Sequence, residues 1–230
     1  MKLSIIIPVF NEEKTIHQLL KKVNSVNYGI EKEIIVVNDG SRDKTLERIL
    51  EAQKKFKKMK IISYSKNKGK GYAIKRAIKL SSGDIIVIQD GDLEYDPRDL
   101  KKLIKPILNE EYKVVYGSRF LGKSSNFDIP LHFLGNKFLS FLTNLLYSKK
   151  ISDMETCYKM MTRDVIKNIK LNATRFEFEP EITIKIIKSG HDIFELPINY
   201  ESRSFKEGKK INWRDGLKAA YYLIKYRFFD

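Results

Sequence analysis

Two carboxylates separated by one glycine are the residues in this sequence whose types and spacing most directly indicate chemistry. Asp90 and Asp92 flank Gly91, directly after the apolar run 85–88. A tight turn with two carboxylates can hold Mg²⁺ or Mn²⁺, because both ions take oxygen ligands and accept phosphate oxygens beside them. Acidic turns are also common as ordinary solvated loops, so this turn needs support from elsewhere in the chain.

Polar residues also follow two other apolar runs. Asn11-Glu12 comes after the run 3–9, and Asn38-Asp39-Gly40-Ser41 comes after the run 33–37. These runs are continuously apolar rather than alternating, which is typical of parallel strands that are covered on both faces. Ligands of such sheets bind beyond the carboxyl ends of the strands. We therefore expect these acids and the Asp90–Asp92 turn to share one site.

The segment Asn67-Lys68-Gly69-Lys70-Gly71 precedes a helical pattern, and its glycines would let backbone N–H groups approach a phosphate. Its spacing fits neither the P-loop nor the dinucleotide fingerprint. Other polar residues in these loops are expected to cap helices. Ser41 or Asp43 is expected to cap the helix that follows, and Asp96 to cap the helix that begins at Pro97.

The elements that must position these residues alternate in the first half of the chain. The pattern predicts strands at 3–9, 33–37, 60–64, 84–89 and 114–117, and helices at 12–26, 44–58, 72–80 and 97–109. Gly83 is expected at the C-terminal cap of the third helix. The remainder reads as a loop over 121–130, a helix over 131–147, mixed α/β structure over 151–200, a basic stretch over 203–210 and a helix over 213–228.

The composition narrows the partners. The chain has 44 Lys and Arg against 29 Asp and Glu, a net charge of +15, which favours nucleic acid, phosphorylated ligands or an anionic membrane face, although an AT-rich genome would also enrich Lys. Cys157 is the only cysteine, which excludes an intrachain disulfide and suggests a buried thiol in a reducing compartment. No apolar run reaches 18 residues and no signal peptide is evident, so we expect a cytoplasmic protein that can associate peripherally with a membrane.

In their order along the chain, these segments resemble the family 2 glycosyltransferases, which have the GT-A fold. The matching segments are 5–12 (Ile-Ile-Ile-Pro-Val-Phe-Asn-Glu), 37–43 (Val-Asn-Asp-Gly-Ser-x-Asp), 67–71 (Asn-x-Gly-Lys-Gly) and 89–94 (Gln-Asp-Gly-Asp-Leu-Glu). The segments 116–119 and 152–154 and the late Arg203 are similar to those of the dolichyl-phosphate mannose or glucose synthase branch. The resemblance covers roughly residues 3–215.

The resemblance implies an α/β fold, with a mostly parallel, Rossmann-like sheet flanked by helices and amphipathic helices near the C-terminus. It implies a single glycosyltransferase domain over 1–230, with a nucleotide-sugar-binding half (1–120) and an acceptor-binding half (121–230). It also implies roles for individual residues. Donor binding falls to Pro8, Phe10, Glu12, Asp39, Lys70, Asp90 and Glu94, metal binding to Asp90 and Asp92, and phosphate or acceptor contacts to Arg119, Arg203 and Lys209.

The implied reaction is a metal-dependent, inverting transfer of a hexose from a GDP- or UDP-sugar to a polyprenyl phosphate, with Asp92, Arg119 and Asp153 as the catalytic residues. A lipid phosphate is already ionised at neutral pH and needs no general base, whereas a hydroxyl acceptor does. Asp153, and after it Glu94, is the candidate base. A lipid acceptor would bring the helices 131–147 and 213–228 to the membrane surface; alternatively, they pack on the sheet or form a dimer contact.

Three other functions compete with this interpretation. The acceptor could be a saccharide hydroxyl in cell-surface polysaccharide synthesis, and a nucleotidyltransferase would also use a metal and an α/β sheet. A nucleic-acid-binding module is suggested by net charge alone, and no recognised nucleic-acid motif is present, so we expect no nucleic-acid partner. Glu94 stands where many mannose synthases have Gln, and 153–156 replaces a more usual Asp-Pro-x-Ser-Gly, which leaves the sugar and the acceptor open.

Overall fold

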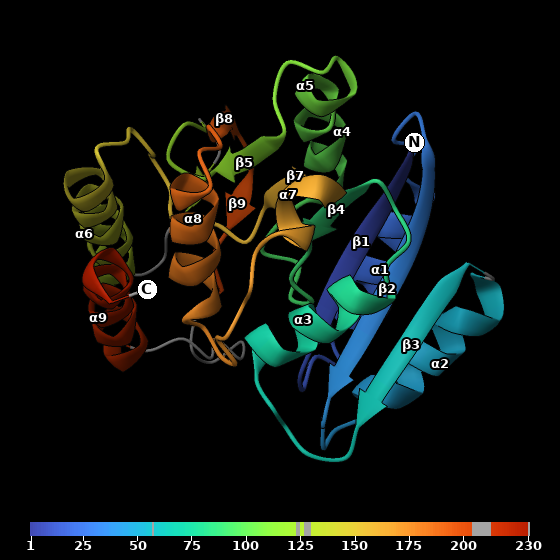
Figure 1. The fold of residues 1–230 in the computed structure, drawn as a ribbon. Coiled ribbons are helices and arrows are strands. Elements are labelled where there is room, and N and C mark those ends of the chain that lie inside the picture. The colour runs from blue at the N-terminus through green and yellow to red at the C-terminus, as the bar shows by residue number, and fades with distance from the viewer. Residues whose placement is uncertain (57, 123–124, 127–129, 204–212, 230) are drawn as a thin grey trace.

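The computed structural model describes residues 1–56, 58–122, 125–126, 130–203 and 213–229, and the side chains of these residues except 125–126, 130–132 and 213. Within them, one mixed sheet forms the centre of the molecule (Figure 1). Its strand order is β3-β2-β1-β4-β7-β5-β8, and only β7 runs antiparallel to its neighbours. The strands are β1 (Lys2–Val9), β2 (Glu31–Asp39), β3 (Met59–Tyr64), β4 (Ile85–Ile88), β5 (Val114–Ser118), β7 (Lys159–Thr162) and β8 (Phe194–Pro197).

A second, two-stranded sheet pairs β6 (Ser125–Asn126) with β9 (Tyr200–Glu201), so the segment expected to be a loop over 121–130 contains a short strand. The helices cover both faces of the main sheet. They are α1 (Ile16–Ser25), α2 (Thr45–Lys55), α3 (Lys70–Leu80), the 3-10 turn η1 (Pro97–Asp99), α4 (Leu100–Leu103), α5 (Lys105–Leu108), α6 (Pro130–Tyr147), α7 (Arg163–Lys167), α8 (Phe178–Lys188) and α9 (Trp213–Phe228).

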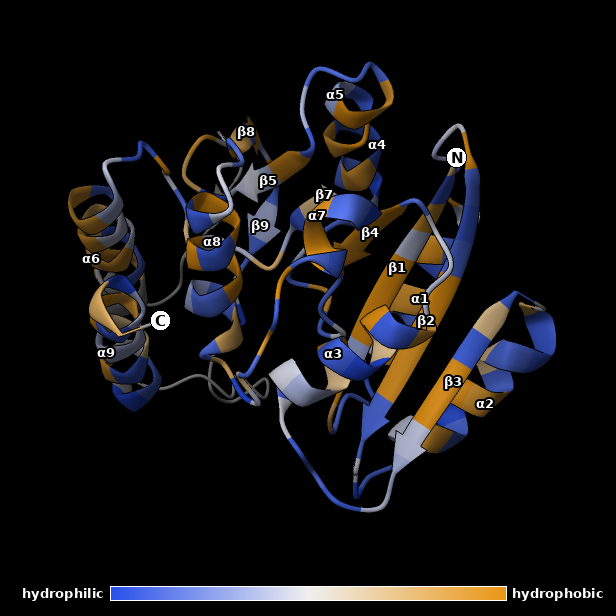
Figure 2. Cartoon of the chain, in the orientation of Figure 1, coloured by the Kyte–Doolittle hydropathy of each residue, from blue (hydrophilic) through white to orange (hydrophobic). Residues whose placement is uncertain are grey.

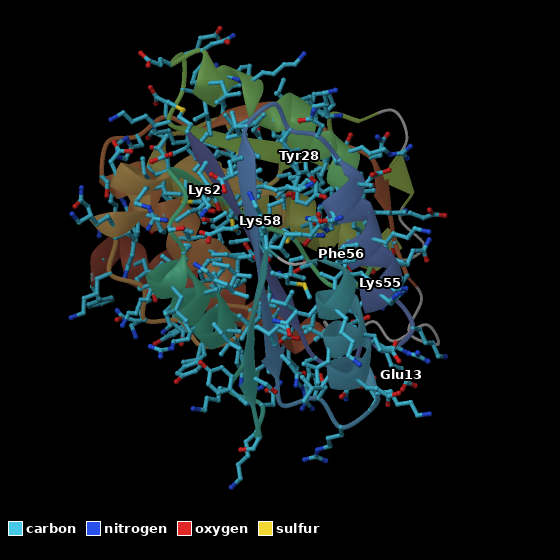
Figure 3. All side chains as sticks on the ribbon, turned by 90° about the vertical axis from the view of Figure 1, so that its right-hand side faces the viewer. Lys2, Glu13, Tyr28, Lys55, Phe56 and Lys58 are labelled. Atoms are coloured by element: carbon cyan, nitrogen blue, oxygen red, sulfur yellow. The ribbon has the colours of Figure 1, made fainter. Side chains whose placement is uncertain are left out.

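The continuously apolar strands are buried on both faces, as predicted. Residues 3–9 of β1 and 33–39 of β2 are all buried, and Figure 2 shows the central strands as hydrophobic beneath more polar helices. The parallel strands β1, β2 and β3 point towards the same end of the molecule. Figure 3 looks onto the β3 edge and shows Glu13 near that end, with Lys2 and Tyr28 towards the other.

A separate small core joins α6, α8 and α9. Leu139, Ile184 and Leu223 are buried together in it, and the hydroxyl of Tyr147 donates to the carbonyl oxygen of Leu223 at 2.8 Å. The helices α6 and α9 lie side by side at the end of the molecule far from β3. No helix in the described part of the chain is long and apolar enough to cross a membrane.

The predicted elements of the first half are confirmed within a few residues, with one exception. The helix expected over 97–109 is broken into η1, α4 and α5. Pro106 explains the break, because it has no N–H to donate to the carbonyl group of Lys102 one turn earlier. Asp96 caps this segment as expected, since its Oδ1 accepts the amide of Arg98 at 2.9 Å. Asp43 likewise accepts the amide of Thr45, the first residue of α2, at 3.0 Å.

The role predicted for Gly83 is wrong. The helix α3 ends at Leu80, and Ser81 takes the cap position. Gly83 instead lies against β1, where its amide donates to Ser4 Oγ at 2.9 Å. A Cβ atom at Gly83 would stand 2.5 Å from Ser4 Oγ and 2.8 Å from the carbonyl oxygen of Lys2. A glycine is needed here because the backbone approaches β1 too closely for any side chain.

We predict that Gly83→Ala lowers the free energy of unfolding by about 1–3 kcal/mol, the usual cost of forcing extra atoms into a packed site. The control is Gly216→Ala in α9, where a Cβ would meet nothing within 4 Å. There the same change should stabilise the helix by up to about 1 kcal/mol. Urea denaturation followed by circular dichroism measures both, and equal stability of the two variants would contradict this account of Gly83.

Candidate active site

The acids predicted to share a site do share one. Glu12 follows β1, Asp39 ends β2, and Asp90 and Asp92 follow β4; all four line a single cavity of about 620 Å³ at the carboxyl ends of these strands. Pro8, Phe10, Lys70, Glu94, Arg119 and Arg203 line the same cavity. The structure thus brings together ten of the residues that sequence analysis assigned to donor, metal or phosphate binding. Lys209 lies outside the described residues.

The Asp90–Asp92 turn stands at the middle of this edge. Gly91 is required there, because a Cβ atom would come within 2.6 Å of Val9 Cγ1. Asp90 Oδ1 pairs with the ammonium group of Lys70 at 2.7 Å, and Asp92 Oδ2 pairs with Arg203 at 3.1 Å. Burial, reinforced by the negative charges of Glu94 and Asp90, raises the pKa of Asp92 to about 7. Burial and the neighbouring acids thus outweigh the effect of Arg203 on the pKa of Asp92.

Arg203 binds three of these acids at once. Its guanidinium lies 3.0 and 3.2 Å from the two carboxylate oxygens of Glu12, besides its contact with Asp92. Its backbone amide donates to Glu94 Oε1 at 3.0 Å, and Glu94 Oε2 accepts from the hydroxyl of Tyr200 at 2.6 Å. Arg203 thus occupies the acidic edge itself, where it links the segment after β9 to the turn.

Asp39 and the segment 67–71 interact with each other. Asp39 accepts the amide of Lys68 at 2.8 Å on one oxygen and that of Gly69 at 2.7 Å on the other. Gly69 has a φ of +100°, and a Cβ atom there would lie 2.3 Å from the carbonyl oxygen of Thr174. The amides of Lys68 and Gly69 are therefore engaged by Asp39. A contact between a phosphate and the other amides of this segment stays a prediction. The glycines are needed for close packing against 173–175.

Arg119 and Asp153 form a buried, two-pronged ion pair. The Nε and one terminal nitrogen of Arg119 each donate to a different Asp153 oxygen at 2.7 Å, and the Arg119 amide adds a third bond at 3.0 Å. Asp153 is fully buried and is not among the residues that line the cavity. Because Arg119 takes both carboxylate oxygens, this geometry argues against Asp153 as a general base. Its evident role is to hold the Arg119 guanidinium at the cavity wall.

Sequence reasoning missed a second buried ion network. The ammonium group of Lys70 lies 3.1 Å from Glu179 Oε1 as well as beside Asp90, and the opposite oxygen of Glu179 accepts from the fully buried Lys159 at 2.8 Å. Burial disfavours the charged lysine, yet Asp90 and its neighbours hold the pKa of Lys70 well above its usual value. No local pattern connects Lys70 to Glu179, which is 109 residues away; the available signal was an acid between Phe178 and Pro180 at the start of α8.

The cavity also has an apolar end. Most of its lining there is apolar, from Gly135, Phe138 and Leu139 of α6 and Leu217 and Ala220 of α9, with Asn136 and Asp215 of the same helices as polar members. In the described part of the chain, no three His, Cys, Asp or Glu side chains converge closely enough to form a metal cage by themselves. Cys157 is buried, as its apolar surroundings predicted, and burial raises the pKa of its thiol well above its usual value.

Comparison with known proteins agrees with this arrangement. The chain is 30% identical to a dolichol-phosphate mannosyltransferase of Pyrococcus furiosus over 91% of its length, although it spans only 59% of that protein. It is 31% identical to a UDP-N-acetylglucosamine–dolichyl-phosphate N-acetylglucosaminyltransferase of Methanococcus voltae, with 96% of this chain and 94% of that protein covered.

The chain is also similar to a solved structure, that of glucosyl-3-phosphoglycerate synthase of Mycobacterium tuberculosis with Mn²⁺ and UDP-glucose. The match covers 98% of this chain and 78% of that protein's chain, with a TM-score of 0.74 and 20% identity. That likeness supports the GT-A fold. The protein family described as "Glycosyl transferase family 2" matches residues 4–170 of the chain. With 167 of 230 residues matched and the acidic turn placed at the sheet edge, the chain belongs to glycosyltransferase family 2.

Proposed function

We propose that this protein transfers a hexosyl group from a nucleotide-diphosphate sugar to a polyprenyl phosphate. One observation carries the proposal: a single cavity runs from the Asp90–Asp92 turn to a largely apolar wall formed by α6 and α9. The charged part suits a diphosphate and the apolar part suits a hydrocarbon chain. The names of the two relatives, both transferases that act on a dolichyl phosphate, agree with this pairing.

The donor would lie along the sheet edge with its nucleoside against Pro8, Phe10 and Asp39, which line the cavity at the ends of β1 and β2. Glu12 stands beside them and is held by Arg203. The diphosphate would then reach the central turn, where Lys70 and Arg203 supply positive charge. One relative is named for a UDP-sugar, which makes a uridine nucleotide the first donor class to test, with guanosine second.

The site fits a divalent cation. Four carboxylates, those of Glu12, Asp90, Asp92 and Glu94, face two cationic side chains, so acids outnumber cations here, and burial together with the neighbouring acids raises the pKa of Asp92. Mg²⁺ or Mn²⁺ is commonly held by one or two carboxylates together with substrate phosphates, so two aspartates of the turn are enough. Asp90 and Asp92 would hold the ion, which would stabilise the charge of the departing diphosphate.

The proposed reaction does not need a general base. The phosphate oxygen of the acceptor would attack the anomeric carbon with inversion, while the bond to the nucleoside diphosphate breaks. Because a phosphate monoester is already ionised at neutral pH, no proton has to be removed. This agrees with an Asp153 whose two oxygens are taken by Arg119. The Arg119 guanidinium at the cavity wall would then attract the phosphate of the acceptor.

The surfaces of α6 and α9 suit contact with a bilayer. Each helix has a row of four exposed apolar side chains at the same spacing, and all eight are between 46% and 67% exposed. The rows are Leu134, Phe138, Phe141 and Leu145 on α6, and Leu217, Tyr221, Ile224 and Phe228 on α9. Phe138 and Leu217 also line the cavity, so the same face would lie against lipid and admit a lipid chain.

We predict that Asp92→Ala abolishes metal-dependent release of nucleoside diphosphate in an assay with UDP- or GDP-hexose and a short polyprenyl phosphate. The loss should be about 100-fold or more, since the carboxylate sits where the leaving group's charge develops. The matched control is Asp164→Ala, which removes an exposed ion pair with Lys113 and should leave the rate unchanged. A folded Asp92→Ala protein with full activity would sink the proposal, and turnover with a saccharide hydroxyl alone would favour the other acceptor class.

The surplus charge predicts how stability depends on pH. The pKa of Asp92 is about 7 in the folded protein and near 4 when unfolded, so the folded state binds more protons, and Asp92 costs stability increasingly as pH rises from 4 to 7. In EDTA, Asp92→Asn should therefore be more stable than the wild type at pH 8, by about 1–3 kcal/mol, and no more stable at pH 4. Thermal unfolding across this range measures the difference, and a pH-independent difference would contradict the charge surplus.

The proposed contact of α6 and α9 with a membrane leads to a separate prediction. The double variant Phe141→Glu/Ile224→Glu should bind anionic phospholipid vesicles at least about tenfold more weakly than the wild type, because each buried Phe or Ile contributes about 1.5–3 kcal/mol. The control is Leu50→Glu/Leu80→Glu, which alters two comparably exposed leucines, at 45% and 43%, on α2 and α3. Vesicle co-sedimentation measures both. Equal binding of the two variants would show that α6 and α9 do not contact the bilayer.

A further inference from the structure

Glu155 is a carboxylate in the cavity that none of the assigned roles uses. It lies between the buried Asp153 and the short strand β7, and it belongs to the cavity lining together with Arg119 and Glu179. Its Oε1 is shielded from solvent and has no hydrogen-bond partner in the described part of the chain. Such an unsatisfied oxygen is costly to a folded protein, so it calls for an explanation in terms of a partner.

The order of the strands shows where along the cavity Glu155 stands. The sheet runs β2-β1-β4-β7-β5, so the residues that leave these strands form a row along one edge. Asp39 ends β2, Asp92 follows β4, and Arg119 follows β5. Because β7 is antiparallel, its beginning lies at the edge where its neighbours end, which places Glu155 between the acidic turn and Arg119.

A bound donor would place its groups along the same row. With the nucleoside at Asp39 and the diphosphate at the Asp90–Asp92 turn, the next group is the hexose, and the acceptor phosphate lies beyond it at Arg119. A carboxylate that does not hold the metal ion is a poor neighbour for either phosphate because like charges repel, whereas it is a good acceptor for sugar hydroxyl groups. Only the sugar position therefore suits Glu155.

The neighbours of Glu155 are already engaged and cannot take its place. Glu179 pairs with Lys70 and Lys159, and Asp153 pairs with Arg119. Burial raises the pKa of Glu155 to about 7, against the opposing effect of Lys159, which is consistent with a carboxyl group that awaits a hydrogen-bonding partner. A small rotation about the soft terminal torsion of the side chain would turn Oε1 towards the cavity.

We propose that Glu155 binds hydroxyl groups of the donor hexose and so determines which sugar the protein accepts. This inference rests on the proposed function, since it requires a nucleotide-sugar donor. It assigns Glu155 no part in holding the nucleotide, because the nucleoside and diphosphate lie nearer to β2 and β4. Glu155 should therefore affect the affinity for a sugar nucleotide and leave the affinity for the bare diphosphate as it is.

The test compares four ligands in the presence of Mn²⁺: UDP, UDP-glucose, GDP and GDP-mannose. Isothermal titration calorimetry gives the ratio of the affinity for each sugar nucleotide to that for its own diphosphate. For the preferred donor of the wild type, this ratio should fall about tenfold or more in Glu155→Ala, the usual effect of removing a hydrogen-bonding group from a site built around it. Glu155→Gln, which keeps one acceptor oxygen, should lose less.

Binding of the bare diphosphate by each variant shows that it is folded. The matched control is Glu111→Ala, an exposed glutamate before β5 at the opposite edge of the sheet, which should leave every ratio unchanged. An unchanged ratio in Glu155→Ala, or a wild type that binds the bare diphosphate as tightly as the sugar nucleotide, would overturn the role of Glu155 alone. A wild type that binds none of the four ligands would overturn the proposed function, and this inference with it.

Discussion

The concentration of carboxylates at one edge of the sheet is the constraint on which the rest of this structure depends. Parallel strands that end together bring Glu12, Asp90 and Asp92 into one cavity, and like charges so close oppose folding unless cations balance them. Arg203 and Lys70 supply part of that balance. The negative charge that remains would attract a divalent ion, which in turn would bind a diphosphate. The same cluster of carboxylates therefore costs folding stability and suits metal-dependent transfer.

The balancing cations also hold the molecule together across its length. Arg203 reaches back 191 residues to Glu12, and Glu179 on α8 fixes Lys70 at the start of α3. The strand β7 lies between β4 and β5, so the second half of the chain completes the sheet of the first. The acidic turn is therefore supported by both halves. The assignment of donor binding to 1–120 and acceptor binding to 121–230 stays a prediction, and Arg203 shows that the boundary is crossed at the site itself.

The two ends of the cavity differ in the kind of surface that they offer. Charged groups fixed by ion pairs line the sheet edge, while α6 and α9 present apolar side chains around their own small core. A protein that moves a sugar from a water-soluble donor to a lipid needs both surfaces close to the bond that forms between the sugar and the acceptor. Arg119, oriented by the fully buried Asp153, lines the same cavity as Phe138 and Leu139 of α6.

The sequence by itself determined the strands and helices of the first half and the residues at the strand ends, because burial on two faces and helix periodicity are local patterns. It also indicated the family, since the acidic turn and the segments around Glu12 and Asp39 are contiguous motifs. Only the tertiary structure decided the partners of these residues. The glycines of 69–71 serve packing against 173–175, Asp153 is held by Arg119, and Glu155 lines the cavity with one buried oxygen that has no hydrogen-bond partner among the described residues. These facts depend on contacts between residues far apart in the chain, and a local pattern of residue types contains no information about which distant groups will meet.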